Sequence, residues 1–313
     1  MSDVFRLLQG LMRTQAVFVA AELGIAEALA DGPLPVGELA GRTGAHADTL
    51  HRFLRALATE GVFAQPEPGV WANTEGSEAL RDGSVGEIAH FFGSAWYRTF
   101  GESLHAVCTG EAVFERAHGT DWWSWLDERP DERTRFDRAM DGDHDAAAEL
   151  LSALDWRGDE TVVDVGGGVG GLLIGLLRRR DGLRGIVFDR EQTAREAETR
   201  IAAAGLSDRL GVAAGSFFDA VPPGDVHVLS GVLHDWDDEP ARAILSRLGG
   251  RVVIVDGILD AEPDREHAWF DLLMLVLVRG RERTEAQWRE LLGSAGYRVE
   301  GIRGGRVIEA VQS

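Results

Sequence analysis

The chain of 313 residues contains no lysine and a single cysteine, Cys108, and it has 52 acidic residues against 32 basic ones. One cysteine cannot form an internal disulfide, which is typical of proteins in the reducing cytoplasm, so we expect a cytoplasmic protein. The net charge of −20 argues against binding to nucleic acid or to anionic lipid, because both reward clustered positive charge. We therefore expect no nucleic-acid partner.

Long apolar segments are also missing. The longest apolar stretches, such as residues 272–278, fall far short of the roughly 18 to 20 residues that a bilayer span requires. The N-terminal residues lack the basic start and apolar run of an export signal. The sequence thus predicts neither a membrane protein nor an exported one. Apolar residues make up 44% of the chain, which excludes disorder as a description of the whole.

Residues 1–90 read as short helices followed by a small β-wing. A helix over 45–58 places Leu50, Phe53, Leu54 and Leu57 on one face, and short strands are expected at 61–63 and 70–72. This pattern predicts a mostly α winged-helix domain, a fold best known for reading DNA. The region contains twelve acidic residues and six arginines, so its negative charge favours a scaffold or dimerisation role instead.

The rest of the chain has two textures. Residues 91–154 stay helical and are rich in aromatic residues, which predicts a connector that lines a flat apolar substrate pocket. From residue 155 to 313, strand and helix signals alternate, which indicates an α/β domain with a doubly wound sheet. We expect its parts at the following ranges: strands 161–165, 185–189, 226–230 and 251–256, helices 172–180 and 193–204, and a terminal hairpin of 297–302 and 306–311.

A glycine-rich loop follows the first of these strands. Gly166, Gly168 and Gly171 satisfy the G-x-G-x-x-G dinucleotide fingerprint, and Asp189 follows where a ribose-binding acid belongs. A NAD-dependent dehydrogenase is therefore one candidate. Asp164 also stands two residues before the first glycine, a pattern that resembles S-adenosylmethionine-dependent methyltransferases. A ligand with an ammonium group and a sulfonium suits a site with carboxylates, whereas Asp164 would repel a pyrophosphate.

The most informative stretch is residues 233–240, which we place at the carboxyl edge of the sheet. His234 is the side chain best suited to take a proton near neutral pH. Asp256 ends the next strand, close enough in this topology to orient the ring, and Glu282 approaches from the other side. Asp237 or Asp238 is suited to cap the following helix. The aspartates do not have the spacing of a calcium loop, and no His or Cys cluster completes a zinc site, so we expect no metal.

Four segments together, residues 164–168, 215–218, 233–239 and 280–284, resemble the small-molecule O-methyltransferases that include plant phenolic and bacterial polyketide-tailoring enzymes. The likeness covers nearly the whole chain. It implies a class I methyltransferase fold, in which a winged-helix dimerisation domain precedes a Rossmann-like seven-stranded sheet. It also implies S-adenosyl-L-methionine as cofactor and a homodimer formed through the N-terminal domain.

The resemblance also implies roles for individual residues. His234 matches the general base, and Asp256 and Glu282 match the two acids beside it, although plant members carry Glu in place of Asp256. Ser216 likewise stands where Asp is common. The expected cofactor contacts are Arg133, Asp143, Asp164, Gly166, Gly168, Asp189, Ser216, Phe217 and Ser230. Our candidates for contacts with an aromatic acceptor are Trp96, Met140, Asp235 and Met274.

The sequence therefore predicts an S-adenosylmethionine-dependent O-methyltransferase that acts on a phenolic hydroxyl of a small aromatic molecule in secondary metabolism. A phenol has a pKa of about 10, so a base is useful at neutral pH. Two alternatives stay open at this point. One is a relative of the same fold that does not methylate, such as a hydroxylase, decarboxylase or pericyclase, and the other is the NAD-dependent dehydrogenase.

Overall fold

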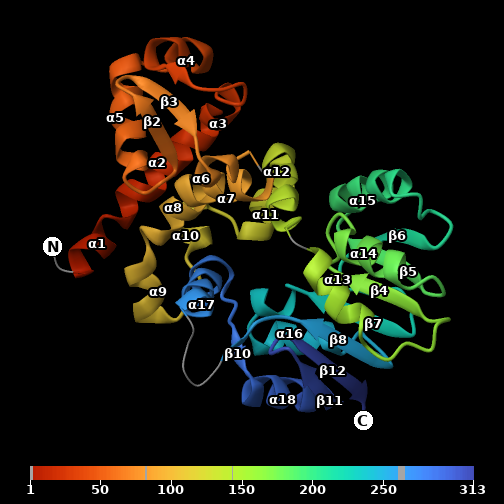
Figure 1. Ribbon diagram of the computed structural model, residues 1–313. Helices are drawn as coiled ribbons and strands as arrows, with labels where there is room; N and C mark the ends of the chain where they lie inside the picture. The colour runs from red at the N-terminus through yellow and green to blue at the C-terminus, as the bar shows by residue number, and fades with distance from the viewer. Residues whose placement is uncertain (1–2, 82, 143, 260–264) are drawn as a thin grey trace. The chain divides into compact units, whose positions relative to one another are not determined.

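The computed structural model describes residues 3–81, 83–142, 144–259 and 265–313 (Figure 1). The chain divides into two compact units, one formed by Met1–Gly101 with Arg138–Met140 and the other by Glu102–Asp137 with Asp141–Ser313. Within the described residues, we find no helix with both the length and the apolar character needed to cross a bilayer.

The first unit is a winged helix, as the sequence predicts. Its core helix α5 begins after His46, whose ring accepts the backbone N–H of Thr49, and it buries Leu50, Leu54 and Leu57 one turn apart. The wing is the antiparallel sheet β1-β3-β2. The elements are α1 (Asp3–Leu8), α2 (Gly10–Glu22), α3 (Ile25–Ala28), β1 (Leu34–Pro35), α4 (Val36–Thr43), α5 (Ala47–Ala58), β2 (Phe63–Glu67), β3 (Val70–Asn73), α6 (Glu75–Glu78), α7 (Gly83–Gly93) and α8 (Ala95–Phe100).

The second unit is built on a seven-stranded sheet of order β11-β12-β8-β7-β4-β5-β6. Five strands are parallel, and β12 joins antiparallel to β8 and carries the hairpin partner β11. The strands are β4 (Thr161–Val165), β5 (Arg184–Asp189), β6 (Leu210–Ala214), β7 (Val226–Ser230), β8 (Arg251–Val255), β11 (Tyr297–Arg303) and β12 (Val307–Gln312). This confirms the predicted fold class, and the expected strands and helices lie within a residue or two of their predicted ranges.

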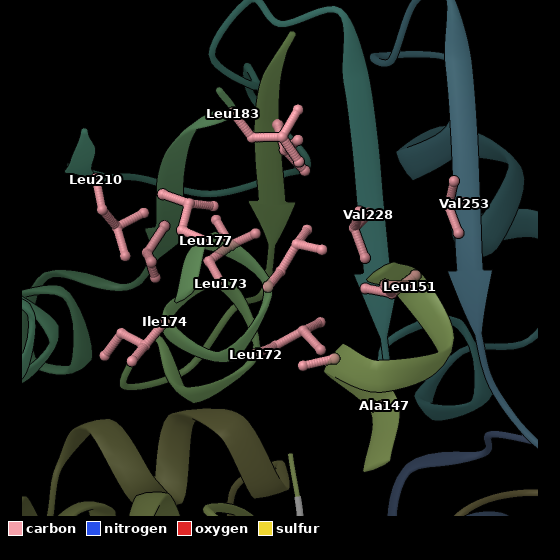
Figure 2. Close-up of a cluster of buried hydrophobic side chains, with 14 of the residues drawn as sticks. Ala147, Leu151, Leu172, Leu173, Ile174, Leu177, Leu183, Leu210, Val228 and Val253 are labelled. Carbon is pink, nitrogen blue, oxygen red and sulfur yellow. The ribbon is translucent and has the colours of Figure 1, made fainter. Parts of the chain in front are cut away.

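Alternate residues of the central strands enter two different cores, because successive side chains in a strand point to opposite faces. On one face Val162, Val228 and Val253 pack with α13 (His144–Ser152), α14 (Gly171–Arg179) and α15 (Glu191–Ala203) (Figure 2). On the other face, Val163 and Ile254 belong to a core with α16 (Asp238–Leu245) and α18 (Glu285–Ser294). Helices therefore cover both faces, an arrangement in which ligands bind at the carboxyl ends of the strands.

The remaining elements of this unit surround the carboxyl edge of the sheet or connect to it. A 3₁₀ turn, η1 (Leu233–Asp235), follows β7, and the short parallel pair β9 (Ile258–Leu259) and β10 (Arg283–Thr284) lies beyond the end of β8. The other helices are α9 (Ser103–Thr109), α10 (Phe114–His118), α11 (Trp122–Asp127), α17 (Arg265–Val278) and α12 (Pro130–Met140), of which the last three residues are assigned to the first unit. The pairing of β9 with β10 brings the segment that contains Glu282 back toward β8.

Candidate active site

The loop after β4 leaves its backbone open, as a ligand-binding loop requires. Gly166 has a φ of +73° and Gly168 a φ of +56°, conformations that side chains rarely adopt. A Cβ on Gly166 would lie 2.8 Å from Val232 Cγ2, whereas a Cβ on Gly168 would meet no described atom within 4 Å. Gly170 then begins α14 in a left-handed conformation. The loop therefore packs against Val232 at Gly166, whereas Gly168 has free space beside it for a ligand.

Two acidic side chains lie beneath and beside this loop. Asp164 is 1% exposed, and neither of its carboxylate oxygens has a hydrogen-bond partner within the described residues. Burial and the charge of Asp189 raise the pKa of Asp164 to about 7. Asp189, at the end of β5, accepts the backbone N–H groups of Gly168 at 2.9 Å and Arg190 at 2.6 Å. An unpaired buried carboxylate beside an open glycine loop fits a ligand that brings an ammonium group or hydroxyl donors.

Arg133 is buried on α12 and already contacts two carboxylates. Its guanidinium donates to Asp127 Oδ1 at 2.9 Å, and Asp137 Oδ1 lies 4.0 Å away. Burial raises the pKa of Asp137 to about 7 against the opposing charge of Arg133, and Thr193 donates its hydroxyl to the same carboxyl at 2.9 Å. Asp137 could not be identified from the sequence, because a charged residue on a polar helix is usually exposed to solvent. Asp143, the other expected contact at this end, lies outside the described residues.

Aromatic rings from three parts of the chain, the loop after β6, the residue after the turn η1 and helix α11, contact one another. The Phe217 and Phe218 rings lie 5.0 Å apart, and Trp236 contacts both edge-on, at 6.0 and 4.8 Å. Trp123 stacks on Trp236 at 6.3 Å. Ser216 is exposed, and its hydroxyl accepts the backbone N–H of Phe218 at 3.2 Å, which stabilises the turn between the two residues. Such a wall offers large flat contact area to a planar group.

His234 lies on η1, just beyond the end of β7, where Ser230 is half-buried. Its Nδ1 is 2.9 Å from Glu282 Oε1 and 3.9 Å from Asp256 Oδ1. Its Nε2 is 3.7 Å from Asp235 Oδ1, beyond hydrogen-bond distance. A neutral ring therefore donates its Nδ1–H to Glu282 and keeps the Nε2 lone pair for a proton.

The charges around His234 make the ring a strong base. Burial disfavours the imidazolium, but the charge of Asp256, the hydrogen bond with Glu282 and the charges of Asp235 and Glu282 outweigh it and raise the pKa of His234 to about 10. Burial raises the pKa of Asp235 to about 7 and that of Asp256 to about 6, each opposed by His234. In the described residues, no group of three His, Cys, Asp or Glu side chains is arranged to hold a metal ion.

The expected acceptor contacts fall in both units. Asp235 lies beside His234, and Met274 is buried on α17, where its carbonyl accepts the N–H of Gly280 at 3.1 Å. Trp96 and Met140 belong to the first unit, and their roles stay predictions. Phe270 was not among the residues predicted from the sequence. It lies on α17, four residues before Met274, and is 40% exposed. The centre of its ring lies 5.4 Å from the centre of the His234 ring. The helical spacing of Phe270 and Met274 places both on one face of α17, but the spacing alone does not show that this face lies toward His234.

Comparison with known proteins gives this site a context. The model of the O-methyltransferase domain matches residues 98–298, and that of the O-methyltransferase dimerisation domain matches residues 5–82. The chain belongs to the O-methyltransferase family. The methyltransferase is 38% identical to the phenazine O-methyltransferase PhzM of Lysobacter antibioticus, over 96% of this chain and 92% of that protein. Its assignment to this family sets the dehydrogenase alternative aside.

Solved structures agree with the fold of the methyltransferase and with its cofactor. The structure of the mitomycin 7-O-methyltransferase MmcR matches with a TM-score of 0.93 and 38% identity, over 99% of this chain and 97% of that one. NcsB1, an O-methyltransferase from neocarzinostatin biosynthesis, matches with a TM-score of 0.88 and 34% identity over the full length of both chains, in a complex with S-adenosyl-L-homocysteine and 1,4-dihydroxy-2-naphthoic acid. The family uses S-adenosylmethionine. Some of the other relatives are named N-methyltransferases.

Proposed function

We propose that this methyltransferase transfers a methyl group to a phenolic hydroxyl of a small aromatic secondary metabolite, with His234 as the general base. The observation that carries the proposal is the 2.9 Å contact between His234 Nδ1 and Glu282 Oε1. In the neutral ring, whose share grows as the pH rises toward the pKa of about 10, this contact fixes the tautomer that leaves Nε2 free to take a proton. Relatives that methylate oxygen on aromatic metabolites support the same choice of acceptor.

The chain's residues handle the proton. When bound, S-adenosylmethionine would supply a methyl group on a positively charged sulfur, and transfer of this group to the acceptor oxygen would release a neutral thioether. His234 Nε2 accepts the hydroxyl proton as the oxygen becomes nucleophilic. Glu282 and Asp256 stabilise the imidazolium that results, because both carboxylates are buried within 4 Å of Nδ1.

The cofactor is held, in our proposal, by the residues at the ends of β4, β5 and β7. Gly166 and Gly168 let the backbone approach the cofactor closely. Asp189 would accept hydrogen bonds from the ribose hydroxyls, and the carboxylate of Asp164 would bind the ammonium group. The further cofactor contacts that we propose are Arg133, Ser216, Phe217 and Ser230.

We also propose that the methyltransferase is a homodimer formed through residues 1–90. A dimerisation-domain match covers most of this region. Six large apolar side chains of α1 and the first turn of α2 are exposed in the single chain, which favours a partner surface. They are Val4, Phe5, Leu7, Leu8, Leu11 and Met12. Light scattering coupled to gel filtration tests this directly, and a mass equal to one chain would contradict it.

The proposed reaction is tested by incubating a panel of phenols and aromatic amines with the protein and S-adenosylmethionine and measuring mass gains of one methylene unit. We expect gains among the phenols, and the His234→Ala variant should be slower by about 10²- to 10⁴-fold. His46→Asn is a matched control, because residue 46 lies in the other unit and asparagine can also cap α5 there. Gains confined to the amines would contradict the proposed acceptor, and an unchanged rate in His234→Ala would contradict the proposed base.

A further inference from the structure

Arg283 is a fully buried arginine whose side-chain hydrogen bonds go to the turn η1, to Trp236 after it and to the first residue of α16. Its Nη1 donates to the carbonyl of Leu233 at 2.9 Å, and its Nη2 donates to the carbonyl of Trp236 at 2.8 Å. Nε and Nη2 both bind Asp238 Oδ1, at 3.1 and 2.9 Å. The guanidinium also lies over the ring of Trp288, 5.2 Å from its centre.

These bonds hold the backbone on both sides of His234. Leu233 and Trp236 bracket the 3₁₀ turn that presents the imidazole, and a turn of three residues has few hydrogen bonds of its own. The carbonyl of His234 itself accepts the backbone N–H of Arg281 at 2.8 Å. A Cβ on Gly280 would lie 2.1 Å from this carbonyl oxygen, so the segment runs directly against the turn.

The same segment therefore contacts His234 in two ways. Glu282 binds the ring nitrogen, and the next residue, Arg283, binds the backbone that carries the ring. We propose that Arg283 is a positioning residue for methyl transfer, which fixes the turn from Leu233 to Trp236 so that the imidazole of His234 keeps its place beside Glu282. This inference rests on the proposed role of His234 as the base.

Charge and geometry make separate contributions here. The charged groups around the guanidinium are Asp238 of α16, Arg281 in its own segment and Asp256 after β8, while Asp271 of α17 accepts the N–H of Glu282 at 2.8 Å. Burial lowers the pKa of Arg283, and Asp238 opposes this. The charge of Arg283 also favours the ionised form of Asp256. A lysine keeps the charge but cannot reproduce the planar fork that reaches both carbonyls and the carboxylate.

The test compares Arg283→Lys, Arg283→Met and the control Arg281→Met, using the phenol that the parent protein methylates fastest. Arg281 is exposed, lies 3.7 Å from the other oxygen of Asp238, and keeps its backbone N–H in the control variant. We expect Arg283→Met to lower kcat by about 10- to 100-fold, because a displacement of about 1 Å has an effect of this size. Arg283→Lys should recover only part of the loss, and Arg281→Met should stay within about twofold of the parent.

Two readouts separate positioning from a general loss of structure. The Kd for S-adenosylhomocysteine, measured by calorimetry, should stay within about threefold of the parent in both Arg283 variants, because only the turn is disturbed. With histidines labelled with ¹³C at Cε1, the signal that disappears in His234→Ala should move in Arg283→Lys and stay in place in Arg281→Met. This second measurement needs neither acceptor nor cofactor, and it applies even if Arg283→Met fails to fold.

A double-mutant cycle completes the test. If Arg283 acts through His234, Arg283→Met should have almost no further effect on the residual rate of His234→Ala. An equal loss in both backgrounds, or an unshifted His234 signal in Arg283→Lys, would overturn the positioning role and leave the proposed function intact. A His234→Ala variant as fast as the parent would instead overturn the proposed function, and the positioning role with it.

Discussion

Replacing Asp164 with asparagine should make the protein more stable while it weakens cofactor binding. Burial and the charge of Asp189 raise the pKa of Asp164 from 3.8 to about 7. At about 1.4 kcal/mol for each pH unit, the ionised carboxylate costs the folded protein about 4 kcal/mol relative to the unfolded chain. Because the folded pKa is the higher one, the stabilising effect of the protonated carboxyl is complete below pH 3.8 and is lost as the pH rises to about 7.

Asparagine has nearly the same shape and no charge to desolvate. Its amide also leaves polar atoms unpaired in this position, at a cost of about 1 to 3 kcal/mol. Near pH 8.5 we therefore expect Asp164→Asn to be more stable than the parent by about 1 to 3 kcal/mol. Near pH 5.5 the parent carries less of the ionisation cost, so the difference should shrink by about 2 kcal/mol.

Urea unfolding at both pH values and one fixed protein concentration measures the two differences. Asp159→Asn is a matched control, because the side chain of Asp159 is 86% exposed and its replacement should give the same small difference at both pH values. The reasoning is refuted if Asp164→Asn is less stable than the parent near pH 8.5, or if its advantage does not depend on pH. Calorimetry should show weaker binding of S-adenosylhomocysteine by Asp164→Asn.

Three more predictions concern the base and its turn. Because the pKa of His234 is raised to about 10, kcat/KM for a phenol should rise with pH between about 7 and 9, and a flat profile would argue against a base of this strength. Removing the charge of Asp256 in Asp256→Asn lowers the pKa of His234, so the rise should move to lower pH while the maximal rate falls; an unmoved profile would contradict this coupling. Gly280→Ala places a Cβ against the carbonyl of His234, so it should lower the free energy of unfolding by about 1 to 3 kcal/mol and slow methyl transfer. Gly293→Ala, a control in α18 with open space around the new Cβ, should change neither quantity. Chemical denaturation measures the stability of both variants, and initial rates measure their activity.

Much of the fold was predictable because its signals are local. Buried parallel strands such as β4 and β8 are short runs of valine and isoleucine, and helix α5 repeats its leucines every turn. Strand β6 was missed, since its sequence, Leu210–Ala214, has only two large apolar residues and lies at the edge of the sheet. An edge strand buries less surface than a central one, so its pattern is weaker.

The site was predictable only where chemistry marks it. His234 and its two acids could be proposed from residue type and from the strand ends that they follow. Arg283 could not be proposed from the sequence, because an arginine in a run of alternating arginine and glutamate is usually exposed to solvent. Only the fold shows that Arg283 is fully buried. Phe270 was missed for a related reason: a helix rich in apolar residues does not reveal which of them faces a histidine from another element.

Several acidic side chains at and near the carboxyl edge of this sheet are buried, and burial disfavours their ionised form. Asp137, Asp164, Asp235 and Asp256 all have pKa values raised first of all by burial, to about 6 or 7. At neutral pH each therefore lowers the free energy of unfolding when it ionises. A ligand that brings positive charge and hydrogen-bond donors to this edge offsets part of that cost, which couples its binding to folding. Cofactor binding should accordingly stabilise the parent more at pH 8.5 than at pH 5.5, and Asp164→Asn should reduce that difference. A thermal shift with S-adenosylmethionine that is equal at both pH values would contradict this coupling.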